Sequence, residues 1–224
     1  MKHAHRPLAL KGFFILWSSQ AVSSLGSSLT SFALILWVYK QQQTATSIAL
    51  LSFFTYLPSI LFCFIAGTLA DRWDKKKIML VCDLFAALCT LTVAILFVIG
   101  TLQVWHLYVA NFLNSFMNAF QNPASYVAVS LLVPKEQYAR ASGLQGFSNS
   151  LNRILTPPLA TAILSFGSLT TVFLIDLGTF LFAFFVLLFF VKLPPLPKNV
   201  EQKKDLIWKN CTAGFLFLKA NTLY

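Results

Sequence analysis

Three ionisable side chains lie inside long apolar stretches of this sequence, at Asp83, Arg153 and Asp176. Charges within membrane spans are energetically expensive, so each is by default a candidate for an ion or substrate pathway. At about 1.5 Å per residue, Arg153 and Asp176 reach a similar depth, and they could form either a structural ion pair or one that carries a proton. Asp83 lies closer to a basic segment, and we expect it to pair with those lysines or with a helix end.

Uncharged polar side chains recur about every three to four residues along three of the apolar stretches, which is the period of one helix face. Such stripes cannot face lipid cheaply, so they predict a shared polar cavity. The alternative is that small polar residues only let helices pack closely, which fits the serines better than the amides. The predicted cavity residues are Gln20, Ser24, Ser27, Asn111, Asn114, Asn118, Gln121, Gln145, Asn149 and Asn152.

Six apolar segments have the length to position these side chains on membrane-spanning helices, because a helix needs about 20 apolar residues to cross the bilayer. The first, fourth and fifth segments carry the polar stripes and should face the interior, with the second behind them. The third and sixth carry no stripe and should be peripheral. We therefore predict an all-α membrane protein with spans over 12–39, 46–70, 78–100, 105–132, 139–166 and 169–191.

The composition favours the same class. Of the 224 residues, 57% are hydrophobic and only 11% are charged, which is too apolar for an ordinary soluble domain. The net charge of +10 does not indicate nucleic-acid binding, because the basic residues stand in short gaps between apolar segments. Most of the 17 lysines and arginines fall on one side of the predicted spans, so the positive-inside rule predicts that both termini are cytoplasmic. We expect the bundle to lie in the plasma membrane. The cysteine and histidine spacings indicate no metal or cofactor.

The chain divides into three predicted parts. Residues 1–11 form a cytoplasmic N-terminus, 12–191 the six-helix transmembrane bundle, and 192–224 a cytoplasmic linker that contains an amphipathic helix. The third and sixth spans also begin alike, with DLFAAL from Asp83 and DLGTFL from Asp176. An inverted three-plus-three repeat predicts this kind of match.

A charged stretch, GTLADRWDKKK, interrupts the apolar sequence between the second and third spans. It resembles the signature loop of the major facilitator superfamily of secondary transporters, with Asp74 where most members have glycine. This departure, together with FQNPA from Phe120 and RILTPPLA from Arg153, is similar to the branch of proton-driven drug exporters that contains macrolide-efflux proteins and the enterobactin exporter. The residues assigned to this gating motif are Gly67, Asp71, Arg72, Asp74, Lys75, Lys76 and Lys77.

The resemblance implies alternating access between two six-helix halves, with a small-molecule substrate and protons as transported species. It assigns Asp71 and Arg72 to a latch against the opposite half, and Gly67 to a close helix approach. The lysines are explained equally well if they only hold this segment in the cytoplasm. The family has twelve spans and this sequence has six, so it resembles an N-terminal half, from a truncated gene, a split gene or a deliberately shortened protein.

Other functions stay open on the sequence alone. The chain could act only by assembling with a C-terminal six-helix half or with a second copy, or it could be an inactive fragment. A membrane domain of an ATP-driven transporter is disfavoured by the short loops and by the lack of a P-loop motif. An intramembrane enzyme is disfavoured because His3, His5 and His106 lie at the start or in a loop, and no acid pair or Ser/His arrangement falls within the spans.

Overall fold

The structure, a computed structural model, describes residues 6–191, with the side chains of 6–10, 64–65 and 68–72 left undescribed. A short 3-10 turn, η1 (Lys135–Gln137), precedes the fifth helix. Each predicted span coincides with one helix to within a few residues, so the all-α architecture is confirmed for this part of the chain. The helices are α1 (Arg6–Gln42), α2 (Ala45–Arg72), α3 (Lys75–Ile99), α4 (Val104–Leu132), α5 (Tyr138–Phe166) and α6 (Leu169–Phe189).

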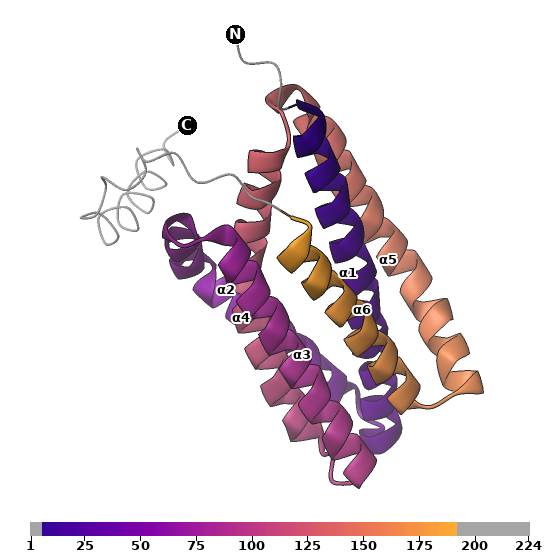
Figure 1. The fold of residues 1–224 in the computed structure, drawn as a ribbon. Helices are drawn as coiled ribbons and strands as arrows, with labels where there is room; N and C mark the ends of the chain where they lie inside the picture. Colours follow the sequence, from indigo (N-terminus) through magenta and orange to yellow (C-terminus); the bar gives the residue numbers. More distant parts are fainter. Residues whose placement is uncertain (1–5, 192–224) are drawn as a thin grey trace, which may run out of the picture.

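The helices run alternately up and down the long axis of the bundle and form two groups (Figure 1). Helices α1, α5 and α6 pack on one side, and α2, α3 and α4 pack on the other. Contacts of α3 with α6, and of α1 with α2 and α4, join the two groups. Helices α1, α3 and α5 all begin at the same end of the bundle, which we call the proximal end.

Four of the helices contain a window long and apolar enough to cross a membrane: Lys11–Gln42, Ala45–Cys63, Lys75–Ile99 and Leu169–Phe189. The sequence predicted six such spans, and α4 and α5 do not meet this criterion of length and composition. Each of the two has 29 residues, which is ample length for a crossing. Their mean hydropathy is lowered by the amides of the polar stripes and, in α5, by two arginines, so any crossing by α4 and α5 depends on shielding a polar face from lipid.

Two apolar clusters hold the bundle together near its two ends. At the proximal end, Phe13 and Leu16 of α1 pack with Met79 of α3 and with residues of α4 and α6. At the other end, residues between Leu29 and Val38 of α1 pack around Phe173 of α6. Between the clusters α1 carries SSQAVSSLGSS, from Ser18 to Ser28, so the middle of the bundle is polar.

Most of the charged stretch GTLADRWDKKK is helical, so the loop between α2 and α3 is short. Gly67 to Arg72 belong to α2, and Lys75 to Lys77 form the first turn of α3, so only Trp73 and Asp74 lie between the two helices. The Asp74 side chain starts α3 by accepting hydrogen bonds from the backbone N–H groups of Lys76, at 2.9 Å, and Lys77, at 3.4 Å. This is the interaction that an N-terminal capping aspartate makes with the first free N–H groups of a helix.

Candidate functional site

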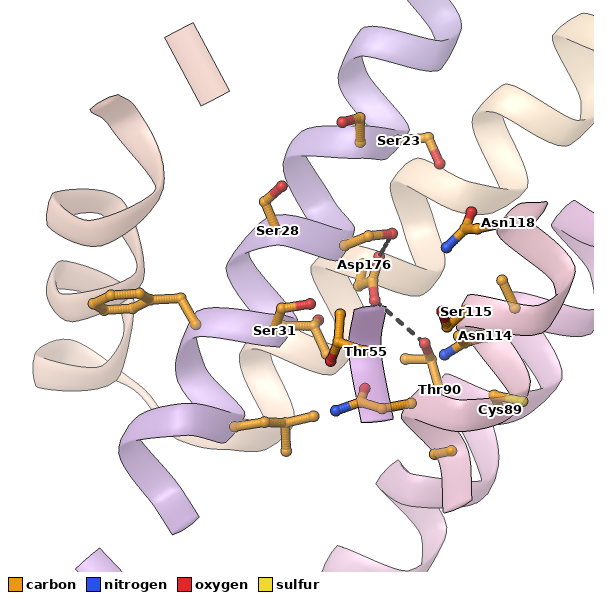
Figure 2. Close-up of a pocket in the computed structure, with 18 of the residues that line it drawn as sticks. Ser23, Ser28, Ser31, Thr55, Cys89, Thr90, Asn114, Ser115, Asn118 and Asp176 are labelled. Carbon is orange, nitrogen blue, oxygen red and sulfur yellow. Dashed lines mark hydrogen bonds between the residues drawn. The ribbon is translucent and has the colours of Figure 1, made fainter. Parts of the chain in front are cut away.

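A cavity of about 880 Å³ occupies the polar middle of the bundle and is lined by all six helices. Figure 2 shows part of its wall, with Ser23, Ser28 and Ser31 on α1 and Asn114 and Asn118 on α4. Of the ten predicted cavity residues, Gln145 is not among the lining residues. The structure brings the other nine together around this space: Gln20, Ser24, Ser27, Asn111, Asn114, Asn118, Gln121, Asn149 and Asn152.

Asp83 lies on the cavity wall and not beside the basic segment, which corrects the sequence expectation. Its carboxylate accepts hydrogen bonds from the side-chain amides of Gln20 on α1, at 3.4 Å, and Gln121 on α4. Because α3 already begins at Lys75, Asp83 is two turns further into the bundle than the lysines, about 12 Å from the helix start. Only 6% of Asp83 is exposed, so the two amides replace the water that the carboxylate has lost.

Asp176 is the second buried carboxylate on the wall, with 3% of its surface exposed. Its Oδ1 accepts a hydrogen bond from the Ser27 hydroxyl of α1 at 3.0 Å, and its Oδ2 accepts one from the Thr90 hydroxyl of α3 at 3.4 Å (Figure 2). Helix α1 approaches α6 closely here because Gly26 has no side chain. A Cβ on Gly26 would lie 3.2 Å from both Cα and Oδ1 of Asp176, and closer still to the Thr179 hydroxyl.

The predicted ion pair between Arg153 and Asp176 is not made, which is a further correction. Both residues line the cavity, but no ion pair joins them within residues 6–191, and the printed partners of Asp176 are hydroxyl groups. Similar depth along two helices did not bring the side chains together, because the Arg153 side chain is exposed while Asp176 faces inward between α1, α3 and α6.

Helices α3 and α6 are not peripheral, since they contribute both acids and several other residues to the cavity wall. Thr90 of α3 is the clearest of the residues that sequence reasoning missed. It follows Asp83 by seven residues, so a helical wheel places it on the same face, and that spacing was a usable signal. Ser115 of α4 was missed as well, although it is 3% exposed and lies on the cavity wall.

Ser115 also connects α4 to the proline position of α2. The hydroxyl of Ser115 accepts a hydrogen bond at 3.1 Å from the backbone N–H of Ser59, which directly follows Pro58. A proline within a helix disturbs the backbone hydrogen bonds around it, and a neighbouring helix must supply the missing partners. The cavity residue Ser115 therefore stabilises the irregular point of α2.

Two lysines of the gating motif have structural positions that the sequence did not indicate. Lys76 donates hydrogen bonds from Nζ to the backbone carbonyls of Leu188, at 2.9 Å, and Val191, at 2.8 Å, at the end of α6. A lysine at this place satisfies carbonyls that the helix itself leaves free. Lys75 is only 2% exposed and donates to the carbonyl of Trp73 at 3.0 Å, so it is not a solvated loop lysine.

The rest of the gating motif is less constrained by the structure. The side chains of Asp71 and Arg72 lie outside the described part of the chain, as do residues 192–224 with their predicted amphipathic helix. The close helix approach expected at Gly67 is not seen, since a Cβ there would meet no described atom within 4 Å.

The remaining histidine of the described helices has a capping position. Nδ1 of His106 accepts a hydrogen bond from the backbone N–H of Gln103 at 3.0 Å, at the start of α4.

The candidate site consists of a polar cavity with two buried carboxylates and one exposed arginine, flanked at the proximal end by the charged connection between α2 and α3.

The family model of the Major Facilitator Superfamily matches residues 16–223 of this chain. The chain belongs to the major facilitator superfamily. This is a family of transporters, so the six helices belong to a transporter fold and the protein is not an enzyme.

Among superfamily members, the chain is 29% identical to macrolide efflux protein A of Streptococcus pyogenes, over 93% of this chain and 51% of that protein. It is 30% identical to macrolide efflux protein A of Enterococcus faecalis, over 76% of this chain and 53% of that protein. The enterobactin exporter EntS of Shigella flexneri is 25% identical over 71% of this chain and 38% of that protein. The chain thus spans about half the length of the curated relatives it matches most fully.

Proposed function

We propose that this chain is the N-terminal half of a secondary transporter that exports small molecules by alternating access, driven by proton antiport. The observation that carries the proposal is the cavity with its two buried carboxylates in the middle of an apolar bundle. Unpartnered polar atoms of the wall, Oδ1 of Asn114 and Oγ1 of Thr156, are available to water or substrate. Since relatives are named for macrolide efflux and enterobactin export, macrolide-like or siderophore-like molecules are the proposed substrates.

The half is proposed to be an inverted three-plus-three repeat, α1–α3 and α4–α6. The helix contacts support this division, because exchanging the two triplets converts the α2–α4 contact into α5–α1 and the α1–α6 contact into α4–α3. All four contacts are among the main packing pairs of the bundle. Asp83 and Asp176 then stand on corresponding helices, α3 and α6.

The second half of the transporter is proposed to close the cavity, whether it is continuous with this chain or a separate subunit. Arg153 supports this arrangement because its side chain is exposed at the cavity and forms no ion pair with any described side chain. A cation at that depth needs a counter-charge, which the second half or a substrate would supply. The alternative is that the chain acts only through such an assembly and transports nothing by itself.

The membrane orientation stays a prediction, with the proximal end and both termini in the cytoplasm. The starts of α1, α3 and α5 support it, because Lys11, Lys75, Lys76, Lys77, Lys135 and Arg140 all lie near this end. Clustering of lysine and arginine on the cytoplasmic side is the usual determinant of orientation.

The proton carrier is proposed to be Asp83, whose carboxylate lies on the cavity wall with amide partners and no cation among the described side chains. A carboxylate at this depth can be neutralised by a proton when the cavity faces the acidic side. The test is export of a radiolabelled macrolide from cells that contain this chain together with a second six-helix half. We expect export that a protonophore stops and that Asp83→Asn abolishes. Export that persists in the protonophore would contradict proton coupling, and no export by the wild-type pair would contradict the exporter assignment.

A further inference from the structure

Oxygen atoms from three helices surround the Asp176 carboxylate. Besides its own two oxygens, the group contains the hydroxyls of Ser27 and Thr30 on α1 and Thr90 on α3. All four residues line the cavity wall. No lysine, arginine or histidine among the described side chains is bound to this carboxylate, so its negative charge is balanced only by neutral hydroxyl groups.

Thr30 is the member of this group with the least complete hydrogen bonding. Its side chain is only 7% exposed, and its Oγ1 is buried without a partner in hydrogen-bonding geometry. It nevertheless lies within reach of the Asp176 carboxylate. Buried hydroxyl groups are almost always satisfied, so a poorly aligned one beside a carboxylate leaves room for a further partner.

A cation placed among these oxygens would satisfy all of them at once. A hydroxyl group has two lone pairs and a rotatable proton, so Ser27, Thr30 and Thr90 can turn from donating to the carboxylate to coordinating a cation. Hard cations prefer oxygen ligands of this kind. A single carboxylate balances one positive charge, which favours a monovalent ion over Mg²⁺ or Ca²⁺.

We propose that Asp176, Ser27, Thr30 and Thr90 form a binding site for one Na⁺ ion. The ion reaches the site from the cavity, because Ser27 is exposed and because Asp176 and Thr30 also line the cavity wall. Binding joins α1, α3 and α6 through one centre, so the ion stabilises this arrangement of the three helices. The site is separate from Asp83, and ion binding to it can be measured without proton transport.

The test is binding of radioactive sodium to the purified full chain in lipid nanodiscs, at about pH 8, where an exposed aspartate is ionised. Thermal unfolding in NaCl, KCl or choline chloride of equal ionic strength gives a second readout. We expect saturable Na⁺ binding and a higher unfolding temperature in NaCl than in the other two salts. Asp176→Asn should weaken Na⁺ binding by about tenfold or more, and Thr30→Val by several-fold, as losses of metal ligands do.

Thr92→Val is the matched control, since it makes the same substitution as Thr30→Val at an exposed threonine of α3 whose hydroxyl donates to the backbone carbonyl of Leu88, and it should leave Na⁺ binding within about twofold of the wild type. Thr30→Val keeps the side-chain shape, so it serves if Asp176→Asn fails to fold. The proposal is overturned if binding is absent, if K⁺ stabilises the chain as much as Na⁺, or if Thr30→Val binds Na⁺ like the wild type. These measurements need no transport, so they stand or fall separately from the proposed export function.

Discussion

Gly26 of α1 lies directly against Asp176 of α6, so closely that a methyl group at position 26 would stand 3.2 Å from the carboxylate oxygen Oδ1. This approach places the Ser27 hydroxyl on the same carboxylate at 3.0 Å. The two helices are therefore in close contact where Gly26 and Ser27 of α1 meet Asp176 and Thr179 of α6.

Replacing Gly26 with alanine should destabilise the protein by about 1 to 3 kcal/mol, because the added methyl overpacks a buried helix contact. The measurement is thermal unfolding of the purified chain in detergent. Gly178→Ala is the matched control, since a Cβ at this glycine of α6 would meet no described atom within 4 Å. Equal unfolding temperatures for the two variants would contradict the close approach.

A cysteine at Asn118 should react with a water-soluble thiol reagent, whereas one at Phe116 should not. Asn118 lines the cavity, while the Phe116 ring packs edge-on against Phe62, with centroids 4.8 Å apart, and against Phe120, at 5.2 Å. The assay is mass-spectrometric labelling in membranes, in a background in which the four native cysteines are replaced by alanine. Labelling of both positions at the same rate would argue against a water-accessible cavity on this face of α4.

Lys76→Met should lower the unfolding temperature by about 2 to 4 °C, which corresponds to a loss of roughly 1 kcal/mol in a chain of this size. The reason is that the carbonyls of Leu188 and Val191 lose their donor. Lys77→Met provides the comparison, because it removes an equal charge from the neighbouring, exposed position. If the two variants unfold at the same temperature, the contacts of Lys76 with the carbonyls of Leu188 and Val191 do not contribute to stability.

The two aspartates of the gating motif should respond differently to substitution by asparagine. Asp74→Asn should keep both stability and transport, because asparagine caps a helix as well as aspartate does, whereas Asp74→Ala should cost about 1 kcal/mol of stability.

Asp71→Asn should cut export while leaving the protein in the membrane, since the latch role implied by the family resemblance depends on its charge. Normal export by Asp71→Asn would refute the latch.

Much of the cavity could be predicted because it depends on helical period alone. Asn111, Asn114 and Asn118 recur on one face of α4, and any helix in that segment turns them in the same direction. The lengths of the helices followed from apolar composition in the same local way, although the polar content of α4 and α5 kept both below the apolar threshold for a span.

The acids could not be placed in the same manner, because their partners depend on how one helix is rotated against another. The depth of Asp83 and Asp176 along their helices was readable, but their directions were fixed by contacts with α1 that lie far away in sequence. Helix α3 begins at Lys75 because Asp74 caps it. The charge of Asp74 assigned it to the gating motif, and so the sequence did not predict this helix start. Gly26 offered no signal, since its significance appears only beside Asp176 and Thr179.

Helix α1 donates to both buried carboxylates, from Gln20 to Asp83 and from Ser27 to Asp176. The two donors are two helical turns apart, about 10 Å along one rigid cylinder. Rotation of α1 about its own axis would move Gln20 and Ser27 in the same direction. It would therefore change the hydrogen bonds to both Asp83 and Asp176, although the two acids do not touch each other. If ligands at both acids favour particular angular settings of α1, each ligand changes the affinity of the other by the same factor.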